Sequence, residues 1–316
     1  MRRLRNLVPS LLLGSTLLAG VSVALGQRLF DATELSIVPV AGNVYMVQRP
    51  GGGGNVGVFV GPDGVLLVDS LFAPLSVKLV AAVSEVSDNE IRFLLNTHIH
   101  GDHIGGNENL AELGVLIFAH DNTRFRFLAE QTRIPRRGGN TGSQPPVGGR
   151  PVITFNDKLS FHLNGEDVRA FLAPPAHTDG DTFIYFPESD VLHLGDVYRT
   201  TSYPIIDVYN GGTLDGTIAA LELAIQIAGP QTKVIPGHGL NVVGREEVQE
   251  FLDMIVDVRE RILSMILDGK KLDEVIAARP TTIYDAQWGQ EQGWTADDFV
   301  PIVYYALGGG GRLLDR

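Results

Sequence analysis

The chain has 316 residues, of which 44% are hydrophobic and 20% charged, and it contains no cysteine. This composition can form a packed core, which excludes a disordered or fibrous protein, and the lack of cysteine excludes disulfides and thiolate catalysis. The formal net charge of −12 at pH 7, or about −15 without the three arginines of the first 26 residues, argues against nucleic acid as a partner.

The first 26 residues have the composition of a secretory signal peptide. Arg2, Arg3 and Arg5 form a basic stretch, residues 7–25 are apolar, and small residues precede Gln27. These features predict cleavage after residue 26 and a mature protein in the periplasm or outside the cell, without stable membrane insertion. The alternative is an uncleaved membrane anchor, since the apolar run approaches the length of a spanning helix, although glycine, serine and proline within it weaken that interpretation.

Apolar patterns and turn residues then predict an alternation of strands and helices. The predicted strands are 43–48, 56–60, 65–69, 91–95, 115–119, 152–155, 158–163, 168–173, 183–186, 191–194 and 233–235. The predicted helices are 77–84, 107–113, 122–131 and 213–228. Strands followed by helices, twice over, predict a four-layer α/β protein: an αβ/βα sandwich of two mixed β-sheets with outer helices.

The end of the chain predicts more helix. We expect residues 27–243 to form a catalytic domain and residues 244–316 a helical extension packed on that same domain. The extension carries a helical apolar stripe at Val248, Phe251, Leu252, Ile255, Ile262 and Met265. Such a stripe is typical of a helix that covers a core, and a dimer interface is the alternative.

One cluster of side chains points to chemistry. His98, His100, Asp102 and His103 lie within six residues, directly after the predicted strand 91–95. Imidazole and carboxylate are ligands that Zn²⁺ prefers, and four of them in one turn fit two ions about 3.5–4 Å apart. The cluster therefore predicts a two-metal site, with a polar loop of scattered histidines as the alternative.

Further candidate ligands follow at strand ends. His177 lies beside small residues, Asp196 follows an apolar run, and His238 lies between two glycines. With the first cluster, this order closely resembles the metallo-β-lactamase superfamily over residues 37–240. The resemblance implies the metallo-β-lactamase sandwich and two zinc ions per chain.

The resemblance also implies a role for each ligand. His98, His100 and His177 would bind the first zinc ion, and Asp102, His103 and His238 the second. Asp196 would bridge the two ions, and a hydroxide held between them would attack the substrate. Besides its ligand role, Asp102 is the residue to which we assign a catalytic function.

The implied function is a secreted binuclear zinc hydrolase that cleaves an amide, ester or thioester carbonyl of a small molecule. A β-lactam is one candidate substrate, but Asp196 occupies the place where zinc β-lactamases carry Cys or Ser and where thioester hydrolases and lactonases carry Asp. A glyoxalase II-like thioester hydrolase or a lactonase is therefore the first alternative. An iron-dependent redox enzyme and a non-catalytic binding protein remain alternatives from other classes.

Three features are candidates for the substrate pocket. Gly53 and Asn55 belong to the glycine-rich segment 51–55, which is either a mobile flap or a loose turn. Arg199, three residues after Asp196, is either a receptor for a substrate carboxylate or a surface arginine. The Gly/Pro/Arg-rich segment 133–150 is either a pocket rim or a mobile loop.

Several polar residues near these motifs are expected not to bind metal. We expect Asp69 to support a metal-binding histidine by accepting a hydrogen bond from its other ring nitrogen. His120 is expected to be a hydrogen-bonded structural residue, and His162 and His193 packing or surface positions. Asp179 and Asp181 are expected to hydrogen-bond within the loop of His177.

Overall fold

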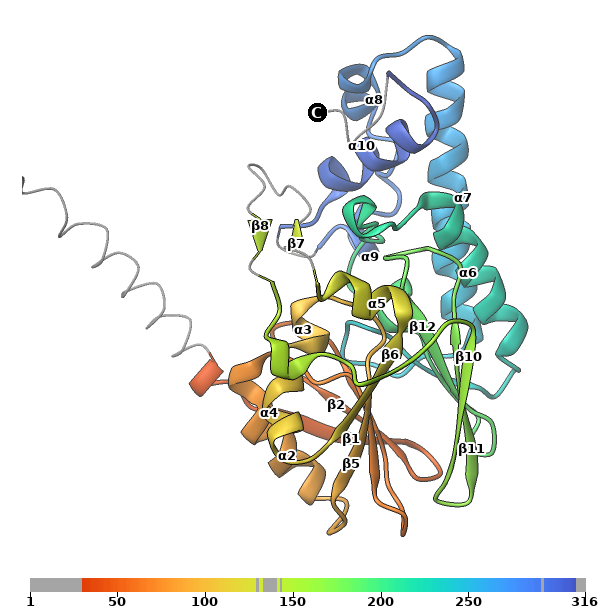
Figure 1. Ribbon diagram of the computed structural model, residues 1–316. Coiled ribbons are helices and arrows are strands. Elements are labelled where there is room, and N and C mark those ends of the chain that lie inside the picture. The colour runs from red at the N-terminus through yellow and green to blue at the C-terminus, as the bar shows by residue number, and fades with distance from the viewer. Residues whose placement is uncertain (1–29, 129–130, 133–140, 143, 291–292, 311–316) are drawn as a thin grey trace, which may run out of the picture. The chain divides into compact units, whose positions relative to one another are not determined.

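The computed structural model describes residues 30–128, 131–132, 141–142, 144–290 and 293–310 (Figure 1). The chain divides into two compact units, Met1–Glu34 and Leu35–Arg316. The described residues of the first unit, 30–34, begin with a short helical turn. The predicted signal peptide lies outside the described residues. Among the helices of the described residues, none is both long enough and apolar enough to span a bilayer.

The second unit contains a seven-stranded sheet with the spatial order β1-β2-β3-β4-β5-β6-β9. Its strands are β1 (Ser36–Ala41), β2 (Val44–Gln48), β3 (Val56–Phe59), β4 (Val65–Val68), β5 (Ile91–Leu95), β6 (Leu116–His120) and β9 (Ile153–Phe155). Neighbours from β1 to β4 are antiparallel, and those from β4 to β9 are parallel. The parallel half brings the carboxyl ends of β4 and β5 to one edge, where Asp69 and the His98 segment follow.

A five-stranded sheet has the order β10-β11-β12-β13-β14. Its strands are β10 (Lys158–Leu163), β11 (Glu166–Leu172), β12 (Thr182–Phe186), β13 (Val191–His193) and β14 (Lys233–Ile235). Only β13 and β14 pair in parallel; the other neighbours are antiparallel. The loops after β11, β13 and β14 carry His177, Asp196 and His238. A separate ladder joins β7 (Gln131–Thr132) and β8 (Thr141–Gly142).

The two sheets pack face to face. Each sheet can also bury side chains against the outer helices, because successive strand residues point to opposite faces. On β12, Ile184 is buried in the core between the sheets with Val68 of β4, whereas Phe183 is buried among the outer helices with Leu221. Figure 1 shows α2 and α4 beside the first sheet and α6 and α7 beside the second. The predicted four-layer αβ/βα sandwich is therefore confirmed.

The helices accompany both halves of the sandwich. Those that follow strands of the first sheet are α2 (Ser76–Ser84), α3 (Gly101–Ile104), α4 (Asn107–Glu112) and α5 (Asp121–Arg126). Those of the second half are α6 (Leu214–Ile227), α7 (Arg245–Leu267), α8 (Leu272–Ala278), α9 (Asp285–Trp288) and α10 (Ala296–Ala306). The described residues also include the short 3₁₀ helices η1 (Ala73–Leu75), η2 (Val147–Gly149), η3 (Gly195–Val197) and η4 (Val208–Asn210).

Two local predictions differ from the structure. The helix expected to reach residue 131 ends at Arg126, and Gln131 instead pairs with Gly142 in a β ladder. Strand β1 was not predicted, since Pro39 interrupts its apolar pattern. Proline is tolerated there because β1 lies at the edge of its sheet.

The C-terminal stripe packs within the chain. The residues of α7 that were expected to cover the core are buried in one cluster with α6 and α10, and Met265 packs against that cluster. The stripe is therefore a packing surface of this chain, and the alternative of a dimer interface is not needed to explain it. Half of the segment 133–150, residues 133–140 and 143, lies outside the described residues.

Candidate metal centre

The first four candidate ligands are positioned by the end of β5 and the start of α3. The chain leaves β5 at Leu95, and α3 begins three residues after His98, with His100 extended at the position before the helix. Asp102 and His103 therefore come from the first turn of α3, and His98 from the loop. This strand-to-helix turn brings all four side chains to the same edge of the first sheet.

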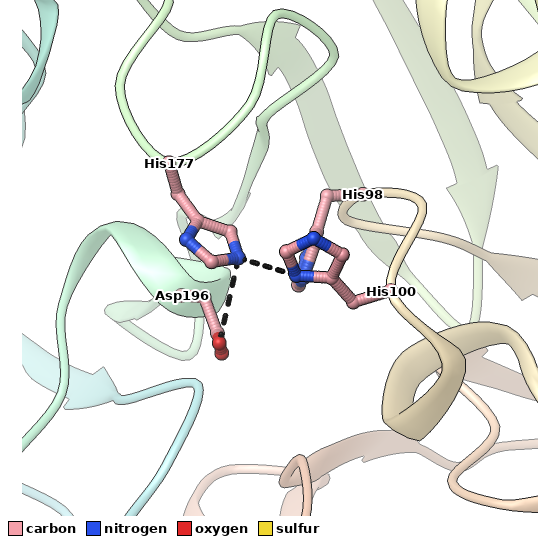
Figure 2. A group of neighbouring side chains, drawn as sticks. All are labelled: His98, His100, His177 and Asp196. Atoms are coloured by element: carbon pink, nitrogen blue, oxygen red, sulfur yellow. Dashed lines mark hydrogen bonds and ion pairs between the residues drawn. The ribbon is translucent and has the colours of Figure 1, made fainter. Parts of the chain in front are cut away.

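One group of side chains combines residues from three loops. His98, His100, His177 and Asp196 offer ligand atoms that all lie within 4.8 Å of one another (Figure 2). His177 Nε2 lies 2.8 Å from His100 Nδ1 and 3.6 Å from Asp196 Oδ2. Three of these residues are buried, and His100 is half-buried. The group has the donor atoms of a single transition-metal site.

A second group lies next to the first. Asp102, His103 and His238 also offer ligand atoms within 4.8 Å of one another. His238 Nε2 is 3.1 Å from Asp102 Oδ2 and 3.5 Å from His103 Nε2. Asp196 connects the two groups, because its carboxylate oxygens lie 3.1 Å from His103 Nε2 and 3.2 Å from His238 Nε2. The structure thus brings together all seven side chains that the resemblance assigned to two ions.

Each histidine of the first cluster has an outer partner that fixes its ring. His103 Nδ1 contacts Asp69 Oδ2 at 2.7 Å, and His98 Nδ1 contacts Thr97 Oγ1 at 2.9 Å. His100 is fixed through Nε2, which lies 2.7 Å from Asp207 Oδ2. In each ring the other nitrogen therefore remains directed toward the group, as is usual for metal-binding histidines.

The expected contact of Asp69 with a candidate ligand is confirmed. Its carboxylate is fully buried and accepts bonds from Thr97 N, Thr97 Oγ1 and His103 Nδ1, each at 2.7 Å. Because Thr97 Oγ1 also contacts His98, one carboxylate orients a histidine of each group.

The donor set fits divalent metal ions. His98 Nε2 is buried and has no hydrogen-bond partner among the described residues. Burial lowers the pKa of His98 well below its usual value, and burial together with His100 lowers the pKa of His177 to about 3. Burial raises the pKa of Asp196, but nearby cationic groups, first of them His238, outweigh it and keep the carboxyl ionised. The neutral imidazoles of His98 and His177 and the ionised carboxylate of Asp196 have the protonation states in which such residues bind metal, whereas neighbouring carboxylates outweigh burial and raise the pKa of His100, His103 and His238.

Glycines allow the chain to pass close to the ligands. A Cβ on Gly54 would lie 2.7 Å from His103 Nε2, and a Cβ on Gly237 would overlap Asp196 Oδ1. Both positions therefore require glycine for the ligands to keep their places. Gly53, by contrast, has a φ of 112°, which a side chain would strain.

The residues predicted to contact substrate have structural partners. Asn55 is buried, and its Nδ2 donates to Pro236 O and Gly239 O, each at 2.9 Å, so it fastens the loop that carries His238. Arg199 is also buried, and its Nη1 donates to Asp196 Oδ2 at 2.6 Å. The structure gives these two side chains a supporting role, since Asn55 holds the His238 loop and Arg199 holds Asp196. The substrate contacts expected of Gly53, Asn55 and Arg199 stay predictions.

Sequence reasoning missed Thr97 beside His98, and it missed two outer partners in a remote loop. Asp207 binds His100, and Ile205 O lies 2.5 Å from His177 Nδ1. Both belong to an irregular segment without periodicity, and a backbone carbonyl carries no side-chain signal at all. The one local signal in the sequence is the pair Gly211 and Gly212, which follows Asp207 closely and indicates a constrained turn.

The other residues expected not to bind metal lie outside both ligand groups. His120 bonds to Asn156 O and Asn122 N, and His162 is exposed. Asp181 accepts bonds from His177 N and from the backbone and hydroxyl of Thr178, so its role as a loop hydrogen-bonder is confirmed. Asp179 instead pairs with Arg126 at 2.6 Å.

His193 predicts a pH dependence of stability. It is fully buried beneath the site, its Nδ1 accepts from Gly195 N, and burial lowers its pKa to about 4. The unfolded chain, with a histidine pKa near 6.5, binds the proton more readily, so stability falls as the pH decreases from about 6.5 to about 4. In urea unfolding of metal-free protein, the wild type should lose about 2 kcal/mol more than His193→Gln between pH 7 and pH 4.5. Equal losses in the two proteins would contradict this.

Comparison with known proteins agrees with the geometry. The family model of the metallo-beta-lactamase superfamily matches residues 49–238, more than half of the chain. A linear primary-alkylsulfatase from Pseudomonas sp. (strain ATCC 19151) is 23% identical over 252 residues, which are 68% of this chain and 48% of that protein. A metallo-beta-lactamase type 2 from Bacillus cereus is 23% identical over 177 residues, or 56% of this chain and 63% of that protein. The chain thus spans between about half and two thirds of the length of these relatives.

A solved structure extends the similarity of fold. A double mutant of the sec-alkyl sulfatase PisA1 matches 92% of this chain and 52% of its own, with a TM-score of 0.65 and 17% sequence identity. This match shares the fold, and the family model covers all seven candidate ligands. The chain therefore belongs to the metallo-beta-lactamase superfamily.

Proposed function

We propose that this chain is a secreted, binuclear zinc hydrolase that acts on a small-molecule substrate. The observation that carries the proposal is the position of Asp196. Its carboxylate lies within 3.6 Å of ring nitrogens of His103, His177 and His238, and so joins the two ligand groups. A carboxylate shared by two sets of histidines fits a pair of divalent cations about 3.5–4 Å apart.

The chain's own residues would hold the ions and orient the reactants. His98, His100 and His177 would hold the first ion, and Asp102, His103 and His238 the second, with Asp196 between them. Two such ions supply an activated water nucleophile and polarise the bond to be cleaved. Histidine and carboxylate donors support zinc as the metal, and iron is the alternative on the same donors.

Asp102 and Arg199 have distinct tasks in this proposal. The side chain of Asp102 is 21% exposed, whereas that of Asp196 is only 3% exposed. Interactions with His103 and His238 outweigh burial and lower the pKa of Asp102, so its ionised carboxylate is available to accept a hydrogen bond from water or substrate. Arg199 donates to Asp196 Oδ2, so that this carboxylate stays in place.

The substrate class has two candidates. The arrangement suits an amide, ester or thioester carbonyl, which includes β-lactams, lactones and glutathione thioesters. A sulfate ester is the second candidate, because an alkylsulfatase is among the relatives and the sec-alkyl sulfatase structure matches most of this chain.

A substrate panel tests the proposal. The purified chain, stripped of metal by a chelator and then reloaded with zinc, would be assayed with a chromogenic cephalosporin, a lactone, a glutathione thioester and an alkyl sulfate. We expect two zinc ions per chain and hydrolysis of at least one substrate, lost on chelation and restored by zinc. Turnover that survives thorough metal removal, or bound iron without hydrolysis, would refute the proposal.

A further inference from the structure

One irregular loop contacts residues of both ligand groups. This connecting loop, residues 198–207, runs from the Asp196 segment to η4 and contains no helix or strand. It supplies two outer partners that sequence reasoning missed: Ile205 O contacts His177 Nδ1, and Asp207 Oδ2 contacts His100 Nε2. Asp207 N also donates to His177 O at 2.9 Å. Two histidines of the first group therefore depend on where this loop lies.

The loop is anchored at Tyr203 by the C-terminal helices. Tyr203 is fully buried, and its hydroxyl donates to Asp285 Oδ1 at 2.8 Å. Its backbone N donates to Trp288 O at 2.9 Å, and its ring stacks on Phe299 with centroids 5.2 Å apart and planes 11° apart. Asp285 and Trp288 belong to α9, and Phe299 belongs to α10.

The second group is held by other contacts. His103 is fixed by Asp69, and the loop of His238 is fastened by Asn55. The part of the connecting loop near His238 has contacts of its own, since Thr200 N donates to His238 O and Arg199 donates to Asp196. The Tyr203 anchor lies two residues before Ile205 and four before Asp207, the two positions that hold His177 and His100.

We propose that the C-terminal helices α9 and α10 are a structural part of the first metal site, and that Tyr203 is the positioning residue through which they act. This inference rests on the proposed two-metal site. The hydroxyl of Tyr203 ties the connecting loop to α9, which keeps Ile205 O and Asp207 at hydrogen-bond distance from His177 and His100. Outer partners of this kind tune metal affinity without touching the ion.

The test compares two tyrosine variants of the full chain. Tyr203→Phe removes the anchoring hydroxyl but keeps the ring on Phe299. Tyr304→Phe is the matched control, because Tyr304 is buried on α10 and its hydroxyl donates to Lys270 O, outside the connecting loop. The readouts are zinc affinity by chelator competition, the ¹¹³Cd NMR spectrum of the cadmium-loaded protein, and thermal unfolding.

We expect Tyr203→Phe to weaken binding of one of the two ions about tenfold and to shift one cadmium resonance, while the second ion and the control are unchanged. Asp285→Asn keeps an oxygen that accepts from Tyr203 and should keep wild-type binding. Asp285→Ala leaves Thr281 O, at 3.3 Å, as the acceptor for the hydroxyl and should weaken binding less than Tyr203→Phe does.

Three results would overturn the inference: unchanged binding in Tyr203→Phe, equal weakening of both ions, or the same effect in Tyr304→Phe. The last two would indicate loss of general stability instead of positioning. The proposed function is tested separately, because it fails if the wild type does not bind two ions, whatever the variants do.

Discussion

Replacement of Asp196 by Asn is expected to lower zinc occupancy and hydrolysis by at least about a hundredfold. The amide has the same shape and can still accept a bond from Arg199, so the fold should persist. It lacks the negative charge that lies between two sets of histidine ligands, which would leave Asp102 as the sole anionic ligand for two divalent ions. Metal content by elemental analysis and turnover with excess zinc measure the two effects.

A matched variant separates this effect from the loss of an ordinary ion pair. Asp179 pairs with Arg126 at the same 2.6 Å distance at which Asp196 pairs with Arg199, but it lies outside both ligand groups. Asp179→Asn should therefore keep both ions and its activity. If Asp196→Asn retained two tightly bound ions, a bridging role for this carboxylate would be excluded.

Asp69→Asn should weaken both metal sites, although Asp69 belongs to neither ligand group. Asn tolerates the backbone conformation there, with a φ of 70°, better than most residues do. Its amide has one accepting oxygen where the carboxylate has two, so Thr97 N or His103 Nδ1 would face an NH₂ group. We expect zinc affinity to fall about 10- to 100-fold and the free energy of unfolding to fall by about 3 kcal/mol.

The matched control for Asp69→Asn is Glu166→Gln. Glu166 is also buried and accepts bonds from Ser189 N and Ser189 Oγ at 2.9 and 2.8 Å, but it holds no histidine. This variant should lose stability without losing metal affinity. Chelator competition measures the zinc affinity of both variants, and urea unfolding measures their stability. An unchanged zinc affinity in Asp69→Asn would contradict the role of Asp69 as a support shared by both groups.

Much of the fold could be predicted because its signals are local. The apolar run at β5, the glycine-rich turns between β2, β3 and β4, and the helical spacing of α6 and α7 each lie within a short window of sequence. Strand β1 escaped prediction because Pro39 breaks its pattern, and its place at a sheet edge makes that break harmless.

The sequence by itself determined which side chains could serve as ligands, since His98 to His103 are brought together by a single turn and the later ligands follow recognisable strand ends. The tertiary structure alone decided what surrounds them. Arg199, which sequence reasoning offered as a substrate receptor, lies buried against Asp196, and Asp207 meets His100 across 107 positions of the chain. The reason is physical: a hydrogen bond forms only when the distance between donor and acceptor is right to within a few tenths of an ångström. Between remote loops, that distance is fixed only when the two sheets and the C-terminal helices have packed.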